Sequence, residues 1–165
     1  MPAPTAIREL LALIDEGFNR KSWHGPTLLG SLRGLSEAEA AWRPAPGRHH
    51  IWELTVHAEY WKYAVRRRLA SLSPGGPVPR GSFRLEGSNY FVRPGGGATF
   101  KDDVKQLVAE HARLRAAVAA VPATRLGARF PGRKESVDHV IRGIAAHDLY
   151  HAGQIQLLKR LREGR

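Results

Sequence analysis

Two histidines four residues apart, His147 and His151, have the type and spacing that could support chemistry. On an α-helix of about 3.6 residues per turn, side chains four apart lie above one another on the same face, within reach of one metal ion. Neutral imidazole is a ligand for zinc, nickel, copper and iron. The same spacing also occurs in surface pairs and in hydrogen-bonded core pairs, so this pair alone leaves metal binding and a structural role equally open.

The helix expected around this pair has an apolar stripe, and both imidazoles lie within it. Alternating steps of four and three residues give Val140, Ile144, His147, His151, Gln154, Leu158 and Leu161. This periodicity is typical of the inward face of a packed helix. Because burying a polar group without a partner costs a few kcal/mol, the two imidazoles and the Gln154 amide need partners, which a metal ion would supply.

A third histidine occupies an inward position in another expected helix, at about residues 50–70. The stripe of that helix is Leu54, His57, Trp61, Val65 and Arg68. Three histidines are the minimum for a catalytic zinc-type site that keeps one position open for water or substrate. Three core imidazoles are less easily explained by chance than two, so His57, His147 and His151 together favour a metal centre.

Two further histidines have structural and functional alternatives. His111 lies in the apolar stripe of a helix expected at 99–121, where a core histidine with a hydrogen-bond partner is favoured over a ligand. His24 lies in the helix break Trp23-His24-Gly25-Pro26. It is a candidate catalytic base or fourth ligand, and a structural histidine at the break is the alternative.

Gln154 and Asp148 are candidates for a supporting role. Gln154 is one turn beyond His151, where it is a candidate cofactor-binding residue that orients a water or ligand, or an amide bonded to the 99–121 helix. Asp148 points about 100° away from His147 on the helix, so it is not expected to be a ligand. It would instead hydrogen-bond His57 or another helix, with a structural role as the alternative.

Helical periodicity, capping signals and helix breakers predict an all-α chain with four long helices. Short helical segments are expected at 27–35, after Pro26, and from the Ser36-Glu37-Ala38-Glu39 capping box to residue 42. The long helices are expected from Thr5, as a cap, to Phe18, at about 50–70, from Thr99 to the residue before Pro122, and from the cap Ser136 to about Arg162.

A segment rich in glycine and proline, 71–98, separates the second and third long helices. Its more structured middle contains Phe83, Leu85, Tyr90 and Phe91. At roughly 3.3 Å per residue it could span the ~30 Å length of a 20-residue helix, so the helices on either side could run in the same direction. A crossover that covers a site and a disordered surface insertion are both open alternatives for its glycine-rich ends, and its path is not predicted.

Composition limits the class of protein. The chain has 165 residues, and we expect a single domain, 1–165, whose core needs no disulfide or structural metal. It has no cysteine, which excludes thiolate zinc sites and a protein thiol nucleophile. The net charge of +11 suggests an anionic partner, but the arginines are scattered, so nucleic-acid binding is not expected. With no signal peptide or apolar span in the sequence, a cytoplasmic protein without a membrane partner is expected.

The motifs described above resemble the DinB-like (YfiT-type) superfamily. The resemblance depends on Trp52-Glu53-Leu54 to His57, on Tyr60-Trp61, and on the run His147-Asp148-Leu149-Tyr150-His151-Ala152-Gly153-Gln154-Ile155. The Trp23-His24-Gly25-Pro26 element, the run Ala41 to Gly47 and the run Glu110 to Leu114 are similar to the same subfamily. The resemblance therefore covers nearly the whole chain.

This resemblance implies a four-helix bundle of up-down-down-up topology, with the long crossover between its second and third helices. It also implies a divalent metal on His57, His147 and His151, for which we expect zinc or nickel, with iron or manganese as alternatives. A homodimer is implied as well. Departures from the family pattern are His50, at a position where a Ser or Thr cap is common, and His139, where an acidic residue is usual; both are expected at the surface. Apolar surface outside the main stripe favours the dimer contact and is contributed by Leu149, Tyr150, Ile155 and Leu157.

Some members of the family are thiol transferases or isomerases that use low-molecular-weight thiols such as bacillithiol or mycothiol, and others are described as metal-dependent hydrolases. We therefore expect a metal-dependent thiol S-transferase or hydrolase with a small-molecule substrate, in which the metal lowers the pKa of a bound water or thiol. Without cysteine, the sulfur must come from a bound thiol cosubstrate. The alternative is a non-catalytic metal-binding stress-response protein, or a basic module that acts through its surface.

Overall fold

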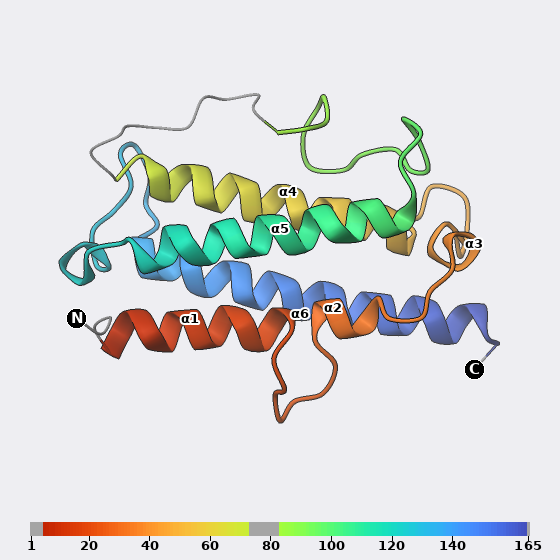
Figure 1. The fold of residues 1–165 in the computed structure, drawn as a ribbon, viewed down its shortest axis with the longest axis horizontal. Helices are drawn as coiled ribbons and strands as arrows, with labels where there is room; N and C mark the ends of the chain where they lie inside the picture. The colour runs from red at the N-terminus through yellow and green to blue at the C-terminus, as the bar shows by residue number, and fades with distance from the viewer. Residues whose placement is uncertain (1–4, 73–82, 165) are drawn as a thin grey trace.

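The computed structural model describes residues 5–72 and 83–164, and these residues form helices without a β-strand (Figure 1). The predicted all-α class is confirmed. Besides the long helices, the described ranges contain two short ones, α2 (Leu28–Ser31) and α3 (Glu37–Ala40), and a 3₁₀ turn at Ala123–Arg125. The long helices are α1 (Thr5–Phe18), α4 (Ile51–Ala70), α5 (Phe100–Ala119) and α6 (Val137–Arg162).

The long helices lie side by side. Helix α4 packs against α5 and α6, while α1 packs against α6 and α5. In Figure 1, α1 and α6 run from left to right, and α4 and α5 run from right to left. The short helix α2 continues along the line of α1 and also packs against α6. None of the helices in the described ranges combines the length and apolar character needed to cross a membrane.

The helix boundaries follow local capping chemistry. The predicted capping box of α3 is present, with the Ser36 hydroxyl accepting from the Glu39 backbone N–H, and Thr99 caps α5 in the same way through Asp102. The segment predicted to be helical at 27–35 contains only α2, which Thr27 caps. It ends early because Gly34 adopts φ +73°, a left-handed conformation that interrupts a helix.

The hydrophobic core is divided across the helices into two apolar clusters. The first cluster contains α4 up to Ala58 and α6 from Ala152 onwards. The second contains α4 from Val65 onwards and α6 up to Ala145. Each fully buried leucine or isoleucine contributes about 1.5–3 kcal/mol to folding. The two clusters therefore stabilise the ends of the helices and leave a band between them that apolar side chains do not fill.

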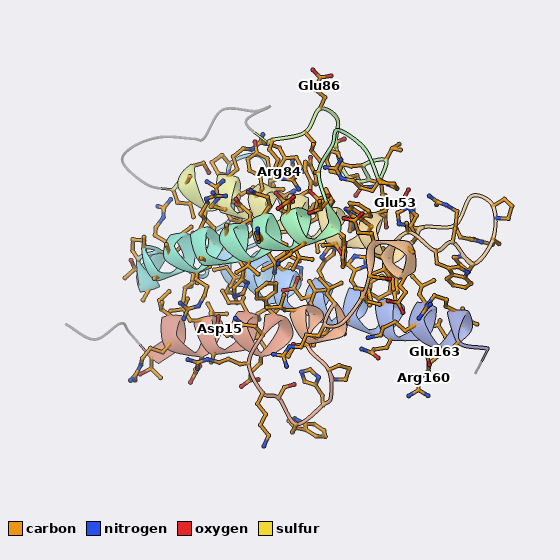
Figure 2. The ribbon with its side chains drawn as sticks, turned by 45° about the vertical axis from the view of Figure 1, so that its right-hand side comes forward. Asp15, Glu53, Arg84, Glu86, Arg160 and Glu163 are labelled. Atoms are coloured by element: carbon orange, nitrogen blue, oxygen red, sulfur yellow. The ribbon has the colours of Figure 1, made fainter. Side chains whose placement is uncertain are left out.

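Buried polar residues from the long helices, together with the half-buried His147, occupy that band, which we call the polar layer. Exposed charges such as Glu86 and Arg160 project from the surface, whereas Asp15 on α1 is buried (Figure 2). Because an unpaired polar group in such a layer is costly, the partners of each member decide its role. The layer contains Asp15, His57, Lys62, Glu110, His111, His147, Asp148 and His151.

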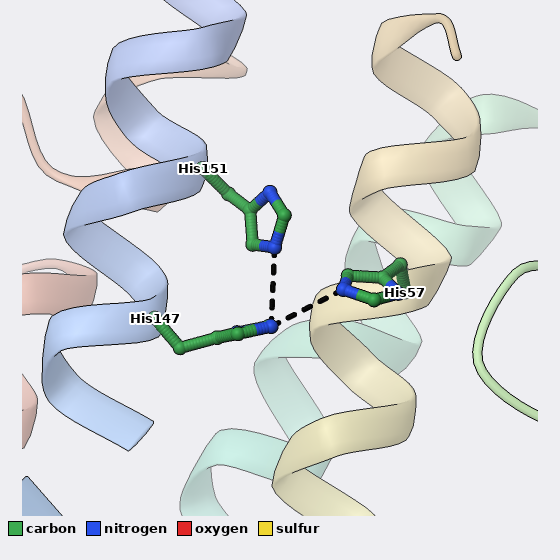
Figure 3. A group of neighbouring side chains, drawn as sticks. All are labelled: His57, His147 and His151. Carbon is green, nitrogen blue, oxygen red and sulfur yellow. Dashed lines mark hydrogen bonds between the residues drawn. The ribbon is translucent and has the colours of Figure 1, made fainter. Parts of the chain in front are cut away.

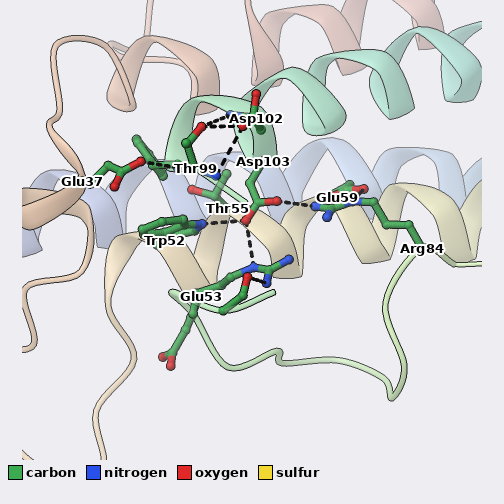
Figure 4. A network of polar contacts seen from close by, with 12 residues as sticks. Glu37, Trp52, Glu53, Thr55, Glu59, Arg84, Thr99, Asp102 and Asp103 are labelled. Carbon is green, nitrogen blue, oxygen red and sulfur yellow. Dashed lines mark hydrogen bonds and ion pairs between the residues drawn. The ribbon is translucent and has the colours of Figure 1, made fainter. Parts of the chain in front are cut away.

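The described part of the crossover, 83–98, packs onto α4 and the beginning of α5. Arg84 donates to Glu59 and to Asp103, and Arg93 forms a buried ion pair with Asp103 (Figure 4). The Trp52 indole N–H also donates to Asp103, at 2.6 Å. The middle of the crossover, which is expected to be more structured, is therefore packed on α4 and α5, whereas the alternative of disorder concerns only its glycine-rich ends. The glycine-rich stretch 74–77 lies outside the described residues.

His50 corrects one prediction. It was expected at the surface, but it is buried and caps α4, with Nδ1 accepting from the Glu53 backbone N–H at 3.3 Å. Its Nε2 donates to the Arg93 carbonyl at 2.9 Å, and burial lowers its pKa. The expectation failed because Arg93 is 43 residues further along the chain and covers His50 only after the crossover has returned. His139 is exposed, as expected.

Candidate metal centre

Three imidazoles from two helices meet in the polar layer (Figure 3). His57 comes from α4, and His147 and His151 come from successive turns of α6. The His147 Nε2 atom lies 3.2 Å from Nε2 of His57 and 3.1 Å from Nε2 of His151. The structure thus brings together the three residues that the sequence predicts as ligands.

Hydrogen bonds on the far side of two rings fix which nitrogen faces the centre. His57 donates from Nδ1 to the Asn89 carbonyl at 2.8 Å, and His151 donates from Nδ1 to the Gln154 side-chain carbonyl at 2.7 Å. Since a neutral imidazole carries one proton, both Nε2 atoms are left with lone pairs. A hydrogen bond that orients a ligand ring in this way is typical of metal-binding histidines.

Without a cation, the position of the His147 ring between the other two imidazoles is energetically costly. His147 can donate one proton from Nε2, which serves at best one of its two neighbours, and its Nδ1 is buried without a hydrogen-bond partner. At least one close Nε2 contact therefore joins two lone pairs. Nitrogen atoms about 2.0–2.1 Å from a metal would be about 3.0 Å apart in octahedral and about 3.4 Å apart in tetrahedral coordination. The observed distances of 3.1 and 3.2 Å lie between these values, so the donor set fits a divalent metal.

Burial keeps the three rings neutral at pH 7. Loss of solvation lowers the pKa of His57 to about 4 and that of His147 to about 3, and it also lowers the pKa of His151. The neighbouring imidazoles lower the pKa of His147 further, because a second positive charge would be repelled. Metal ligands must be deprotonated, so the site is ready to bind a cation without first losing protons.

The crossover covers one side of this centre. Asn89 has φ +70°, a conformation that asparagine tolerates better than most residues, and its side-chain oxygen accepts from the Trp61 indole N–H at 3.0 Å. The Tyr90 ring stacks on His57 with centroids 4.1 Å apart and on His49 with centroids 3.7 Å apart. Asn89 and Tyr90 therefore fix the His57 ring. The sequence suggests that 71–98 covers a site, but nothing in its pattern pairs Asn89 with His57.

A buried ion pair lies in the same layer. The Lys62 ammonium donates to the Asp148 carboxylate, and their side chains are 0% and 1% exposed. Burial lowers the pKa of Lys62 and raises that of Asp148. Asp148 therefore supports packing between α4 and α6 through Lys62. Sequence reasoning missed Lys62 because the predicted stripe passed through its neighbour Trp61, which is only partly buried.

His111 and His24 do not join the three-histidine cluster. His111 is buried, donates from Nε2 to Asp15 at 3.2 Å and stacks on Phe18, so it is a core histidine with a hydrogen-bond partner, as predicted. His24 lies in the exposed loop between α1 and α2, with Nδ1 3.5 Å from the Ser22 hydroxyl. A catalytic role for His24 stays a prediction.

Three predictions on α6 need correction. Gln154 orients His151 and donates to the Tyr150 hydroxyl at 3.1 Å, so its amide is not bonded to α5. Leu161, placed on the inward stripe, is 49% exposed, because it lies in the part of α6 that extends beyond the other long helices (Figure 1). Ile155, expected to add apolar surface for a dimer, is fully buried within the chain.

Comparison with known proteins gives one match. A family model described as the DinB superfamily matches residues 22–155, which is well over half of the chain and includes all three histidines of the centre. No curated protein and no solved structure gives a significant match.

Proposed function

The chain belongs to the DinB superfamily, and we propose that it is a divalent-metal-dependent enzyme whose metal ligands are His57, His147 and His151. The observation that carries this proposal is the convergence of three Nε2 atoms, two of them fixed as lone-pair donors by hydrogen bonds at Nδ1. Zinc or nickel suits three neutral imidazoles, with iron or manganese as alternatives.

A thiol S-transferase or a hydrolase is the proposed reaction class, with a small-molecule substrate. A bound divalent metal supplies a lowered pKa for a coordinated water or thiol. The chain's own residues hold the ligands: Asn89 and Gln154 keep the protons on Nδ1, and Tyr90 shields the His57 ring from water. Because the chain has no cysteine, a low-molecular-weight thiol would have to enter as a cosubstrate in the transferase reaction.

The proposal is tested first by metal content. Elemental mass spectrometry on tag-free protein should find about one divalent ion per chain in the wild type, and much less in His57→Ala and His151→Ala. His111→Ala is the matched control, because it removes another buried imidazole from the same layer. Wild-type protein that contains no metal and takes up neither zinc nor nickel would overturn the proposal.

The reaction class is tested on metal-loaded protein. A transferase should consume an alkylating electrophile only when a low-molecular-weight thiol is present, because the new carbon–sulfur bond takes its sulfur from that thiol. A hydrolase should cleave an activated ester without thiol. In both cases His151→Ala should lose the activity, whereas the exposed control His139→Ala should keep it.

We also propose that the fold is the up-down-down-up four-helix bundle, forming a single domain and a cytoplasmic homodimer. The opposite directions of α1 and α6 relative to α4 and α5 support the topology (Figure 1). Tyr150, which is 64% exposed on α6, supports a contact between copies. Sedimentation equilibrium should give a dimer for the wild type, and Tyr150→Asp should weaken it.

A further inference from the structure

A pocket of about 470 Å³ opens beside the metal centre, and one face of α6 forms part of its wall. Its volume lies in the range that accommodates small ligands. The rest of the wall is formed by the loop between α3 and α4 with Leu54 at the beginning of α4, and by Tyr90 of the crossover. Three segments far apart in the sequence therefore build one concave surface.

Two residues of the pocket wall also hold the metal ligands in place. Gln154 accepts the hydrogen bond from His151 Nδ1, and Tyr90 stacks on the ring of His57. A molecule that fills this pocket would therefore contact the groups that orient two of the three ligands. The pocket therefore adjoins the metal centre through Gln154 and Tyr90.

Most of the remaining wall is apolar. Leu54, Leu157, Leu158 and Leu161 contribute aliphatic surface, and Pro44 and Ala45 extend it. Leu157 and Leu161 are about half exposed, although such side chains usually gain a few kcal/mol from burial. An apolar ligand body would remove their surface from water.

In the part of the chain that the structure describes, the pocket wall contains a basic residue and no acidic one. Glu53, which lies nearby, is already paired, with Arg43 at 2.8 Å and with His49 at 3.1 Å. Arg48, an exposed residue, lines the pocket, and among the described residues its side chain has no carboxylate partner. Its backbone carbonyl accepts from Arg43, which helps to fix the loop that carries it. A guanidinium without a carboxylate partner can match a substrate carboxylate through two parallel hydrogen bonds.

We propose that this pocket recognises the substrate of the metal centre, and that the substrate is an amphipathic carboxylate. Its apolar body lies on the leucines, and its carboxylate binds Arg48. The inference rests on the proposed metal-dependent function, because it assigns the pocket to the same site. It goes further by naming a substrate class and the residue that selects it.

Binding of 4-phenylbutyrate and 4-phenylbutanol to metal-loaded protein, measured by calorimetry, tests this assignment. The two probes share an apolar body and differ in the carboxylate. The acid should bind at least about tenfold more tightly than the alcohol, since a charged hydrogen bond contributes about 1.5–3 kcal/mol. Arg48→Ala should reduce the affinity for the acid to the value for the alcohol. It should leave the affinity for the alcohol unchanged. Arg160→Ala, which removes an exposed arginine from α6, should change neither.

A second variant tests the apolar wall. Leu157→Asn should weaken both probes by a similar factor, because it removes apolar contact and leaves Arg48 in place. Equal affinity of the wild type for the two probes, or an Arg48→Ala variant that still prefers the acid, would overturn the inference. A wild-type dimer that binds neither probe would also overturn it, because the leucines would then be covered by a second copy.

Metal content measured on the same samples separates this inference from the proposed function. Metal-loaded protein that binds neither probe leaves the metal centre intact and removes only the pocket assignment. In cobalt-substituted protein, phenylbutyrate should perturb the visible spectrum at the concentration that saturates calorimetric binding, because Gln154 holds His151. An equal spectral change with acetate at that concentration would show direct coordination of the carboxylate and overturn the role of Arg48.

Discussion

Buried histidines occupy both sides of the polar layer, and they differ in what surrounds them. His111, between α1 and α5, donates to the carboxylate of Asp15. The three histidines between α4 and α6 have only neutral partners: a backbone carbonyl, an amide oxygen and one another. Burial lowers the pKa of His111 to about 3, as it does for His147. Depth and pKa therefore do not distinguish a ligand from a structural histidine in this protein.

The charge of the hydrogen-bond partner distinguishes a structural histidine from a metal ligand. An anion beside His111 satisfies one ring nitrogen and leaves no set of lone pairs to receive a cation. The three-histidine centre has several lone pairs directed to one point and no described anion to complete it. Lys62, which lies between the two regions, lowers the pKa of both His111 and His147 through its charge. The regions are thus electrostatically linked, and variants can separate them.

The largest expected effect on stability comes from breaking the buried ion pair between Lys62 and Asp148, which lies between the two regions. Lys62→Met leaves the Asp148 carboxylate buried and unpaired, which should lower the free energy of unfolding by about 3–5 kcal/mol. The double variant Lys62→Met/Asp148→Leu should recover most of that loss, because no buried charge remains. Urea denaturation of the metal-free protein measures both. Equal losses for the single and double variants would contradict a role for the ion pair in both regions.

Added metal should separate the two kinds of histidine. At a free zinc concentration about 100 times the dissociation constant, binding should raise the free energy of unfolding by about 2.7 kcal/mol. Calorimetric melting should show this increment in the wild type and in His111→Ala, although the latter starts from a lower stability. His57→Ala should not gain it. An increment in His57→Ala equal to that of the wild type would place the metal elsewhere.

The neutral hydrogen-bond partners of the three histidines should contribute more to metal affinity than to folding stability. Gln154→Leu removes the oxygen that orients His151, and loss of such a partner typically weakens metal binding by about 10–100-fold. A competition titration with a chromophoric chelator measures the change. Gln156→Leu, two residues away on α6 and outside the hydrogen bonds of the centre, is the control. Similar affinity of both variants would mean that Gln154 does not position the ligand.

Acidification should lower the stability of the metal-free protein through the histidines of both regions. The pKa values of His57, His147 and His111 are lowered to about 4, 3 and 3, so below the ordinary value of 6.5 the unfolded chain binds protons that the folded chain does not. The metal-free protein should therefore lose stability as the pH falls from about 6.5 towards 4.

The same pH series can isolate the contribution of His111. His111→Phe should reduce the slope of stability against pH by up to about 1.4 kcal/mol per unit, and His139→Phe, at an exposed position, should not. Denaturant titrations between pH 7 and 5 measure the slopes. A His111→Phe slope equal to that of the wild type would show that this histidine is protonated without cost.

Local sequence patterns predicted the helices that carry the centre and the residues within it. The bounds of α4, α5 and α6 agree with the predicted ranges to within a residue or two, because periodicity and end signals lie within the segment that they describe. His57, His147 and His151 could be identified for the same reason: each lies on the inward side of its own helix. His111 was correctly predicted to be a core residue.

Tertiary structure decided which groups complete each site. Asn89 is 32 residues from His57, Arg93 is 43 from His50 and Asp148 is 86 from Lys62. No pattern within one helix encodes such contacts, since they depend on how the crossover returns and how α4 is rotated against α6. The sequence by itself therefore determined the helices and the three imidazoles. Packing decided which partners hold those imidazoles and where a pocket opens beside them, because both require surfaces from separate segments to meet.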